Sequence, residues 1–467
     1  MLNKHFNSKN AEFITMYGRR RVGKTFLIRE TFSQKDCYFV YATGERNAPM
    51  AKQLANFMEA VSATFYGSAP LAPATNWHDA FKLLHSQMVA SDCKVVVFLD
   101  ELPWMATPRS QLLNTIDYYW NRHWQQLGHV KLIVCGSSAS WMIKKIIQDK
   151  GGLHGRTTCK IKLEPFTLAE TREFLKSQKI RLNNKETTAL YMALGGIPYY
   201  LRQVESGLTA AQNIQTLLFE KNAPLQEEFI LLFQSLFNDA DAYIELIRLI
   251  ATKREGVSRR YIKEKVKLSA SGGILTERLN DLALAGFIES YIPWGRQKGE
   301  YFKLVDEFCL FYLTWLDPQK NKRFLPDYWI AQSQKPAYLA WSGYAFEAIC
   351  MKHLEQIIKA LKIPAGGTAS TWRYRSTEKE KVGAQIDLLI ERSDNAFTIG
   401  EIKYTDTPFQ LDKAAATQLQ QKVTTFQQQT KTTKQLFIAL ISANGIKDTM
   451  YSEELVAQVV TLEDLFA

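Results

Sequence analysis

A glycine-rich segment near the start of the chain constrains the fold more than any other feature. Residues 18–25 match the pattern G-x-x-x-x-G-K-[ST] at every fixed position. The apolar run EFITMY precedes this segment and the helix-like run KTFLIRETF follows it. A loop between a strand and a helix directs backbone N–H groups at phosphates, with help from the helix dipole. The sequence therefore predicts a P-loop whose phosphate-binding residues are Gly18, Arg19, Arg20, Arg21, Val22, Gly23, Lys24 and Thr25.

The acidic end of a later apolar run, VVVFLD, fits the same chemistry. In P-loop proteins the lysine bridges the β- and γ-phosphates, and the threonine hydroxyl with a strand-end aspartate holds Mg²⁺. We therefore expect Lys24 to bind ATP, Thr25 and Asp100 to hold Mg²⁺, and Glu101 to orient or deprotonate the attacking water. An apolar run ending in two acids is also typical of a strand with a solvated end. The P-loop upstream favours the catalytic reading.

A further strand, LIVCG, leads directly to Ser137. A polar side chain at this position can sense the γ-phosphate. A plain turn is the alternative.

The order of patterns along the 467 residues predicts several domains, because a single core stops growing near 250–300 residues. Short apolar runs alternate with helical patterns up to residue 165, which predicts an α/β fold with a parallel sheet covered by helices. The helical patterns after residue 165 predict a helical lid domain. Three helices and a two-stranded ribbon then predict a winged helix-turn-helix. The expected domains are 1–165 (P-loop ATPase core), 166–235 (helical lid), 236–320 (winged helix-turn-helix), 321–337 (linker) and 338–467 (an α/β restriction-endonuclease-like domain).

The last of these domains carries a second group of charged residues. A long helix, predicted from Tyr338 to Leu361, precedes the strands QIDLLIE and AFTIGEIKY, and thirteen residues separate Asp387 from Glu401. Glu401 and Lys403 lie on one face of their strand, since side chains alternate every residue. The order D-x(n)-E-x-K is that of PD-(D/E)XK nucleases. There the carboxylates bind a metal and the lysine orients or activates water.

On this reading Asp387 and Glu401 hold the metal, Lys403 assists catalysis, and Glu347 on the preceding helix supplies a third carboxylate. Gln385 stands where related sites often carry an acid. Solvated charges on edge strands are the alternative.

The charge of the chain is compatible with a polyanionic partner. The net charge is +11, and residues 251–304 contain eleven Lys or Arg against six Asp or Glu. The winged helix-turn-helix would bring basic side chains to DNA, with the wing on phosphate. A regulatory module that contacts only its own chain is the competing interpretation. The basic residues concerned are Arg259, Arg260, Arg278, Arg296 and Lys298.

The remaining composition predicts a cytoplasmic protein. No segment approaches the roughly 18 apolar residues of a membrane helix, and the first residues contain no signal peptide. The six cysteines are scattered singly and form no C-x-x-C pair, so we expect buried thiols and neither disulfides nor a zinc site.

Several motifs together resemble one family. YGRRRVGKT, VVVFLDELPW, LIVCGSSAS, HGR followed by LEPF, GGIPYYL and a carboxy-terminal EIK are similar to the archaeal-type ATPases of prokaryotes. That family is related to the STAND and AAA proteins, and its members often carry a nuclease-like carboxy-terminal domain. The resemblance implies that Arg156 contacts the γ-phosphate and that Pro198 is a lid residue near the nucleotide. A surface arginine is the alternative for Arg156.

Two classes of function follow from these patterns. In the first, the nucleotide state of the P-loop domain controls a winged helix and a nuclease-like domain that act on DNA. In the second, the chain is a nucleotide switch or scaffold that binds a protein partner and cleaves nothing. A sequence-specific transcription regulator is a third, weaker reading.

Overall fold

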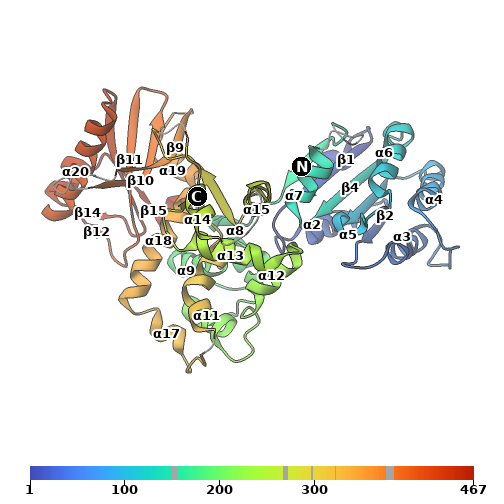
Figure 1. Cartoon of the computed structure of the whole chain (residues 1–467), viewed down its shortest axis with the longest axis horizontal. Helices are drawn as coiled ribbons and strands as arrows, with labels where there is room; N and C mark the ends of the chain where they lie inside the picture. Colours follow the sequence, from blue (N-terminus) through green and yellow to red (C-terminus); the bar gives the residue numbers. More distant parts are fainter. Residues whose placement is uncertain are drawn as a thin grey trace. The chain divides into compact units, whose positions relative to one another are not determined.

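The chain forms two compact units, which are described separately (Figure 1). The computed structural model describes residues 1–148, 153, 155–266, 272–295, 298–320, 322–364, 366–374 and 383–467. The first unit comprises Met1–Pro165 and Ser271–Gly286. The second comprises Phe166–Ala270 and Phe287–Ala467.

A five-stranded sheet forms the centre of the first unit. Its strands are β1 (Glu12–Tyr17), β2 (Tyr38–Thr43), β3 (Val95–Asp100), β4 (Val130–Gly136) and β5 (Cys159–Lys162). All neighbouring strands are parallel, in the order β2-β3-β4-β1-β5. The predicted parallel sheet is thus confirmed. Because β4 lies between β1 and β3, the carboxyl ends of three strands with candidate residues meet at one edge of the sheet.

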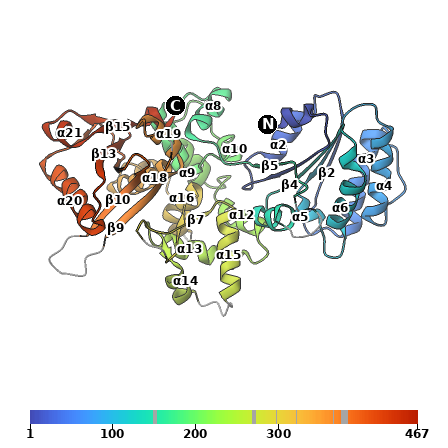
Figure 2. The ribbon, with the colours of Figure 1, turned by 90° about the horizontal axis from the view of Figure 1, so that it is seen from above.

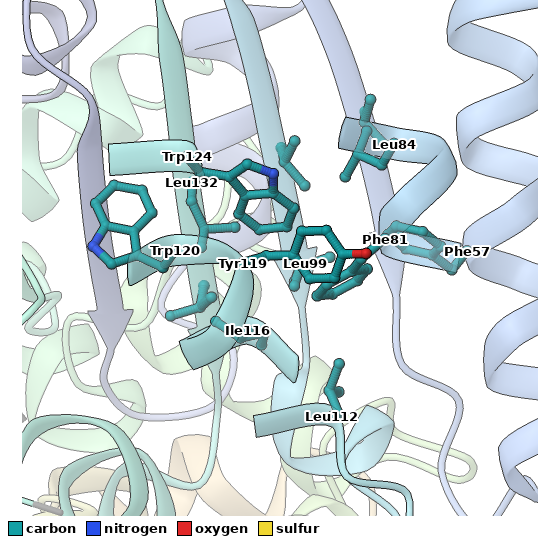
Figure 3. Close-up of a cluster of buried hydrophobic side chains, with 14 of the residues drawn as sticks. Phe57, Phe81, Leu84, Leu99, Leu112, Ile116, Tyr119, Trp120, Trp124 and Leu132 are labelled. Carbon is teal, nitrogen blue, oxygen red and sulfur yellow. The ribbon is translucent and has the colours of Figure 1, made fainter. Parts of the chain in front are cut away.

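Helices cover both faces of this sheet. Alternate strand residues such as Ile14, Val96 and Ile133 pack with Phe6 and Ile28 of the first two helices. The opposite residues, including Leu99 and Leu132, join an aromatic-rich core with Phe57, Phe81 and Trp124 (Figure 3). Burial on both faces explains why the strands read as nearly continuous apolar runs.

The helices of the first unit are, in chain order, α1 (Leu2–Asn7), α2 (Lys24–Phe32), α3 (Met50–Phe65), α4 (Trp77–Ala90), α5 (Leu102–Met105), α6 (Leu112–Arg122), η1 (Trp124–Gln126), α7 (Ala139–Met142), η2 (Ile143–Ile147) and α15 (Gly272–Leu284). The last of these joins the unit through Lys144 of η2, whose Nζ pairs with Glu277 (2.9 Å) and Asp281 (3.1 Å). Figure 2 shows the two helical layers from above.

The second unit begins with helices, as the sequence predicts for 166–235. They are α8 (Leu168–Ser177), α9 (Asn184–Leu194), α10 (Pro198–Leu201), α11 (Ala210–Ile214), η3 (Gln215–Phe219) and α12 (Glu228–Leu236). The next part contains α13 (Ala240–Ala251), β6 (Val257–Ser258), α14 (Arg259–Lys265), β7 (Ile288–Tyr291) and β8 (Tyr301–Leu304). The three short strands form an antiparallel sheet in the order β6-β8-β7.

The stretch 321–337, predicted as a linker, packs into the second unit where the structure describes it. It contains α17 (Tyr328–Gln332), and Trp329 is fully buried there against Phe219, Phe311 and Trp315. The neighbouring elements are α16 (Glu307–Trp315) and η4 (Asp317–Gln319).

The carboxy-terminal part is built on a five-stranded mixed sheet in the order β15-β13-β11-β10-β9. Its strands are β9 (Gly367–Tyr374), β10 (Ala384–Arg392), β11 (Ala396–Lys403), β13 (Gln435–Ser442) and β15 (Gln458–Thr461). The other elements are α18 (Pro336–Lys352), α19 (Leu354–Ala360), β12 (Phe409–Gln410), α20 (Lys413–Thr430), β14 (Ile446–Lys447), α21 (Met450–Leu455) and α22 (Leu462–Leu465).

The long helix predicted from Tyr338 to Leu361 is divided at His353 into α18 and α19. The buried His353 accepts a hydrogen bond at Nε2 from the Leu168 N–H (3.0 Å), and its Nδ1 lies 2.8 Å from the Ile349 carbonyl oxygen. The spacing of apolar residues along the sequence could not reveal this break, because the break coincides with a hydrogen bond from Leu168, which is far away in sequence.

Two further expectations concern cysteines and membranes. Four cysteines are buried as expected, but Cys93 is exposed and Cys37 only half-buried. Within the described ranges, none of the helices combines the length and apolar character required to cross a bilayer.

Candidate functional site

Two glycines shape the loop between β1 and α2. Gly18 has φ +148°, and a Cβ there would lie 2.2 Å from the Leu163 carbonyl oxygen. Gly23 is left-handed (φ +93°) and directly precedes the first residue of α2. A residue with a side chain would be strained at both positions. These glycines let the backbone turn from β1 into the amino terminus of α2, where N–H groups are unpaired.

Lys24 lies inside this loop and is only 6% exposed. Its Nζ donates hydrogen bonds to the carbonyl oxygens of Gly18 (2.9 Å) and Arg19 (2.8 Å). Burial lowers the pKa of Lys24, although the carboxylates of Glu101 and Asp100 favour the ammonium form. The charge is therefore held in the loop at the place where phosphate oxygens are expected.

The structure brings Thr25 and Asp100 together. The Thr25 hydroxyl donates to Asp100 Oδ2 (2.6 Å), and the Glu101 N–H donates to Asp100 Oδ1 (3.0 Å). Asp100 ends β3 and is almost completely buried. A hydroxyl and a carboxylate in contact at the amino end of α2 provide two oxygen donors of the kind Mg²⁺ prefers.

Glu101 and Ser137 also form a pair. The Ser137 hydroxyl and N–H donate to the two carboxylate oxygens of Glu101 at 2.5 and 3.0 Å. Ser137 follows β4, which lies between β1 and β3 in the sheet, so both residues reach the same edge. Glu101 has a left-handed backbone (φ +48°), which is uncommon for a residue with a side chain and is often found at functional positions.

The other loop residues have different surroundings. Arg19 is buried, Arg21 is left-handed (φ +72°), and the Arg20 guanidinium lies 5.8 Å from the centre of the Trp104 ring. Val22 is buried as well. Trp104 follows the Asp100-Glu101 pair by a few residues, so this contact links the two predicted halves of the site.

The sequence reasoning missed Tyr41 on β2. Burial raises the pKa of this phenol, and the charge of Asp100 raises it further. The Arg29 guanidinium lies 5.6 Å from its ring centre. Because β2 neighbours β3 in the sheet, Tyr41 stands beside the strand that ends in Asp100. Only the strand order could have revealed this neighbour.

The two residues implied by the family resemblance lie in other elements. Arg156 is exposed in the turn before β5, and within the described residues no side-chain contact links it to Lys24 or Glu101. Pro198 begins α10 in the second unit. Both remain predictions as nucleotide contacts.

A second charged group lies on the carboxy-terminal sheet. β10 and β11 pair antiparallel with Leu388 opposite Gly400, so the register places Asp387 opposite Glu401. The Ile402 N–H donates to Asp387 Oδ2 (3.4 Å), and Gln385 Nε2 lies 3.4 Å from Asp387 Oδ1. The predicted pair of carboxylates is thus on adjacent strands.

Two lysines hold Glu401, which is 9% exposed. Lys403 Nζ lies 2.9 Å from one carboxylate oxygen and Lys422 Nζ 2.6 Å from the other. Burial raises the pKa of Glu401, but the two ammonium groups outweigh it and keep that pKa below its ordinary value. Lys422 lies on α20 and was missed, because a lysine among Gln and Thr residues reads as part of a solvated helix face.

Burial has the largest effect on the pKa values of the other two carboxylates, Asp387 and Glu347. Burial and then the charge of Glu401 raise the pKa of Asp387. Burial and then Asp387 raise the pKa of Glu347 to about 7. Within the described ranges, however, no three His, Cys, Asp or Glu side chains gather closely enough to hold a metal ion. Glu347 therefore lies near Asp387 and Glu401, but the three carboxylates do not form a three-ligand metal cluster.

Two of the basic residues of the predicted winged helix form ion pairs within the chain. Arg259 lies 3.6 Å from Glu300, and Arg260 pairs with Glu264 (2.8 Å). Arg278 lies on α15, Lys298 is exposed, and Arg296 is outside the described residues. Between β7 and β8, Trp294 Nε1 donates to Glu391 on β10 (3.0 Å), so part of this hairpin is anchored on the carboxy-terminal sheet.

The parallel sheet, the P-loop and the paired residues at its edge define the first unit as a P-loop ATPase domain. In agreement, residues 1–204 match a family described as an ATPase domain predominantly from Archaea. The match extends past the first unit into the helices that follow it.

Similar proteins include three from archaea. An uncharacterized protein of Methanocaldococcus jannaschii, MJECL04, is 25% identical over 411 residues, which cover 87% of this chain and 85% of the relative. Among solved structures, the Walker-type ATPase PABY2304 of Pyrococcus abyssi gives a TM-score of 0.47 at 18% identity, covering 67% of this chain and 93% of that one. The ORC2 protein of Aeropyrum pernix with ADPNP and ADP gives 0.41 at 13%, covering 67% and 89%.

Proposed function

We propose that this protein binds and hydrolyses ATP with Mg²⁺ at the P-loop, and that its nucleotide state controls a metal-dependent nuclease site acting on DNA. The proposal is supported by two separate groups of charged residues in one chain, each of a composition suited to phosphate chemistry. One is Lys24, Thr25, Asp100 and Glu101. The other is Asp387, Glu401 and Lys403.

The residues of the first group fit a nucleotide and its metal. Lys24 would exchange its two carbonyl partners for β- and γ-phosphate oxygens, and Thr25 and Asp100 would hold Mg²⁺. When bound, Mg²⁺ neutralises charge on the phosphate oxygens. Glu101 orients the attacking water or accepts its proton, and Ser137 holds that carboxylate in place. The Ser137 hydroxyl is also proposed to sense the γ-phosphate.

Two further residues complete the proposal for hydrolysis. The Arg156 guanidinium neutralises charge that develops on the γ-phosphate, and Pro198 belongs to a lid that reports the nucleotide state. Arg156 is exposed in the turn before β5, which leaves its guanidinium accessible to an incoming phosphate.

The second group fits a divalent metal through two carboxylates. Asp387 and Glu401 supply oxygen donors on adjacent strands, and water would complete the coordination. Lys403 stands beside them to hold the attacked phosphate or the attacking water. Glu401 must first give up part of its pairing with Lys403 and Lys422, so metal binding and lysine release are linked.

DNA is the substrate that the charge of the chain supports best. Helices α13, α14 and α15 with the β7–β8 hairpin follow the order of a winged helix-turn-helix, and this part of the chain has an excess of basic residues. Lys298 is exposed on the hairpin and is proposed to contact phosphate, as is Arg296 on the basis of sequence alone.

The proposal is tested by measuring ATP hydrolysis and plasmid nicking with one preparation, in Mg²⁺ or Mn²⁺. We expect both activities in the wild-type protein, and nicking alone to be lost in Asp387→Ala. Nicking that persists in Asp387→Ala would place the activity elsewhere or in a contaminant.

A second function has its own support. Both oxygens of Glu401 are occupied by lysines, no three-ligand metal cluster is found within the described residues, and two winged-helix arginines pair with glutamates. These features favour a nucleotide switch or scaffold that binds a protein partner through an inactive nuclease fold. ATP hydrolysis without cleavage of any DNA or RNA would support it.

A further inference from the structure

A lysine outside the carboxy-terminal domain faces the second charged group. Lys303 lies on β8, where Phe302 and Leu304 point into the core and Lys303 points to the other face. Its Nζ lies 5.6 Å from the ring centre of Tyr344 on α18. Glu347 is one helical turn beyond Tyr344, so both residues lie on one face of α18.

Several contacts fix this segment against the carboxy-terminal domain. The Tyr344 hydroxyl donates to the Arg254 carbonyl oxygen (3.0 Å), and Arg373 pairs with Glu255 (2.9 Å). Trp294 packs between Phe397 and Phe426, with ring centres 5.4 and 5.5 Å away. These contacts all lie within the second unit, so the position of Lys303 beside α18 is held in the loop between β7 and β8, through Trp294, and in the turn before β6, which pairs with β8.

The charges around Lys303 differ from those around the other two lysines. Lys403 and Lys422 are both committed to Glu401. Lys303 is attracted by Glu347, by Asp387 and by Glu289 on β7, yet it forms no direct ion pair among the described residues. Burial lowers the pKa of Lys303, and Glu347 opposes this effect. A half-buried ammonium group without a carboxylate partner is suited to an incoming anion.

We infer that Lys303 is a phosphate-binding residue of the nuclease site, supplied by the winged-helix segment and facing Asp387 across the bound strand. The inference rests on the proposed nuclease function and deepens it: the substrate is a nucleic acid strand held between the hairpin and the carboxylates. The site is then composite, and its substrate binding depends on the docking of β7 and β8 on the carboxy-terminal domain.

The test compares Lys303→Met with Lys303→Arg, in the full chain with Mn²⁺. Lys359→Met is the control, because Lys359 is an exposed lysine on α19 outside the site and its loss removes the same charge. We expect Lys303→Met to raise KM for DNA cleavage roughly tenfold, the effect of losing one charged hydrogen bond. The slope of log affinity against log salt should fall by about 1. Lys303→Arg and Lys359→Met should stay close to wild type.

The outcomes separate the two proposals. A wild-type protein that cleaves, with Lys303→Met unchanged in KM and salt slope, overturns only the role of Lys303. A wild-type protein that neither cleaves nor binds Mn²⁺ overturns the nuclease function and this inference with it. If Lys303→Met shows no cooperative thermal unfolding, it is not folded, and Lys303→Gln takes its place in the test. A folded Lys303→Gln with wild-type KM would equally contradict phosphate binding by Lys303.

Discussion

At the scale of single residues, the P-loop depends on one buried cation. Lys24 is held by two carbonyl oxygens of its own loop and stands near two carboxylates. Such a group is placed before the phosphates arrive, so little reorganisation is needed on binding. Its contribution to affinity should therefore be large and separable from the fold.

Lys24→Ala is expected to weaken triphosphate binding by at least about 30-fold, because charge-assisted hydrogen bonds contribute roughly 1.5–3 kcal/mol each. Isothermal calorimetry with ATP and Mg²⁺ measures the effect. Lys52→Ala, at an exposed position of α3 in the same unit, is the control. If Lys24→Ala bound ATP with wild-type affinity, the assignment of residues 18–25 as a P-loop would be wrong.

Glu101→Gln separates binding from turnover. The amide keeps the shape of the side chain and can still accept from Ser137, but it cannot take a proton. We expect ATP affinity within a few-fold of wild type and a fall in kcat of about 100-fold or more, as is usual for a lost general base. An unchanged steady-state rate would make Glu101 a structural residue.

Glu347 gives the stability of the second unit a pH dependence. Its folded pKa of about 7 exceeds the ordinary value of 4.5, so between these values the folded state binds more protons and this residue lowers stability as pH rises. The charged groups acting on it are Asp387, Lys303, Glu401 and Lys403. Glu347→Gln stays neutral and should be more stable than wild type at pH 8 but not at pH 5. Urea unfolding at both values measures this difference, and parallel pH profiles would contradict it.

At the scale of elements, buried hydrogen bonds join helices that are distant in sequence. His353 sits at the junction of α18 and α19 and accepts from the first N–H of α8. The contact with the Ile349 carbonyl oxygen assigns the proton to Nδ1. Burial lowers the pKa of His353, in keeping with a neutral ring.

His353→Leu is predicted to destabilise the second unit by about 1–3 kcal/mol, because the buried Leu168 N–H would lose its acceptor. His129→Leu is a less buried comparison in the first unit. Thermal or urea unfolding measures the change. A loss of less than about 0.5 kcal/mol in His353→Leu would show that the hydrogen bond is not needed.

The elements also show what the sequence can predict. Motifs of consecutive residues, such as the loop 18–25, are local and determine their own conformation, so the P-loop and the strands around it follow from the sequence. Tyr41, Lys422 and Lys303 could not be predicted, because their roles depend on strand order and on contacts between distant segments. The burial of Trp329 in the predicted linker could not be foreseen either, because its aromatic neighbours such as Phe219 are distant in sequence.

At the scale of the whole molecule, the two groups that we propose to act on phosphates belong to different units and use different residues. Lys24→Ala should therefore lose affinity only for ATP, and Asp387→Ala only for the metal at the carboxy-terminal site. We expect Lys24→Ala to keep its affinity for Mn²⁺ at the carboxy-terminal site, and Asp387→Ala to keep its affinity for ATP. Calorimetry of both variants with both ligands tests this independence, and loss of both affinities in one variant would contradict it.

We expect the nucleotide state of the P-loop to control cleavage. The most direct test is the rate of plasmid nicking in Mn²⁺ by Glu101→Gln, which should retain bound ATP, measured with and without ATP. We predict nicking whose rate differs at least about fivefold between the two conditions, a coupling of about 1 kcal/mol, and no such difference in Lys24→Ala. Equal rates with and without ATP, or no nicking in either condition, would contradict the claim.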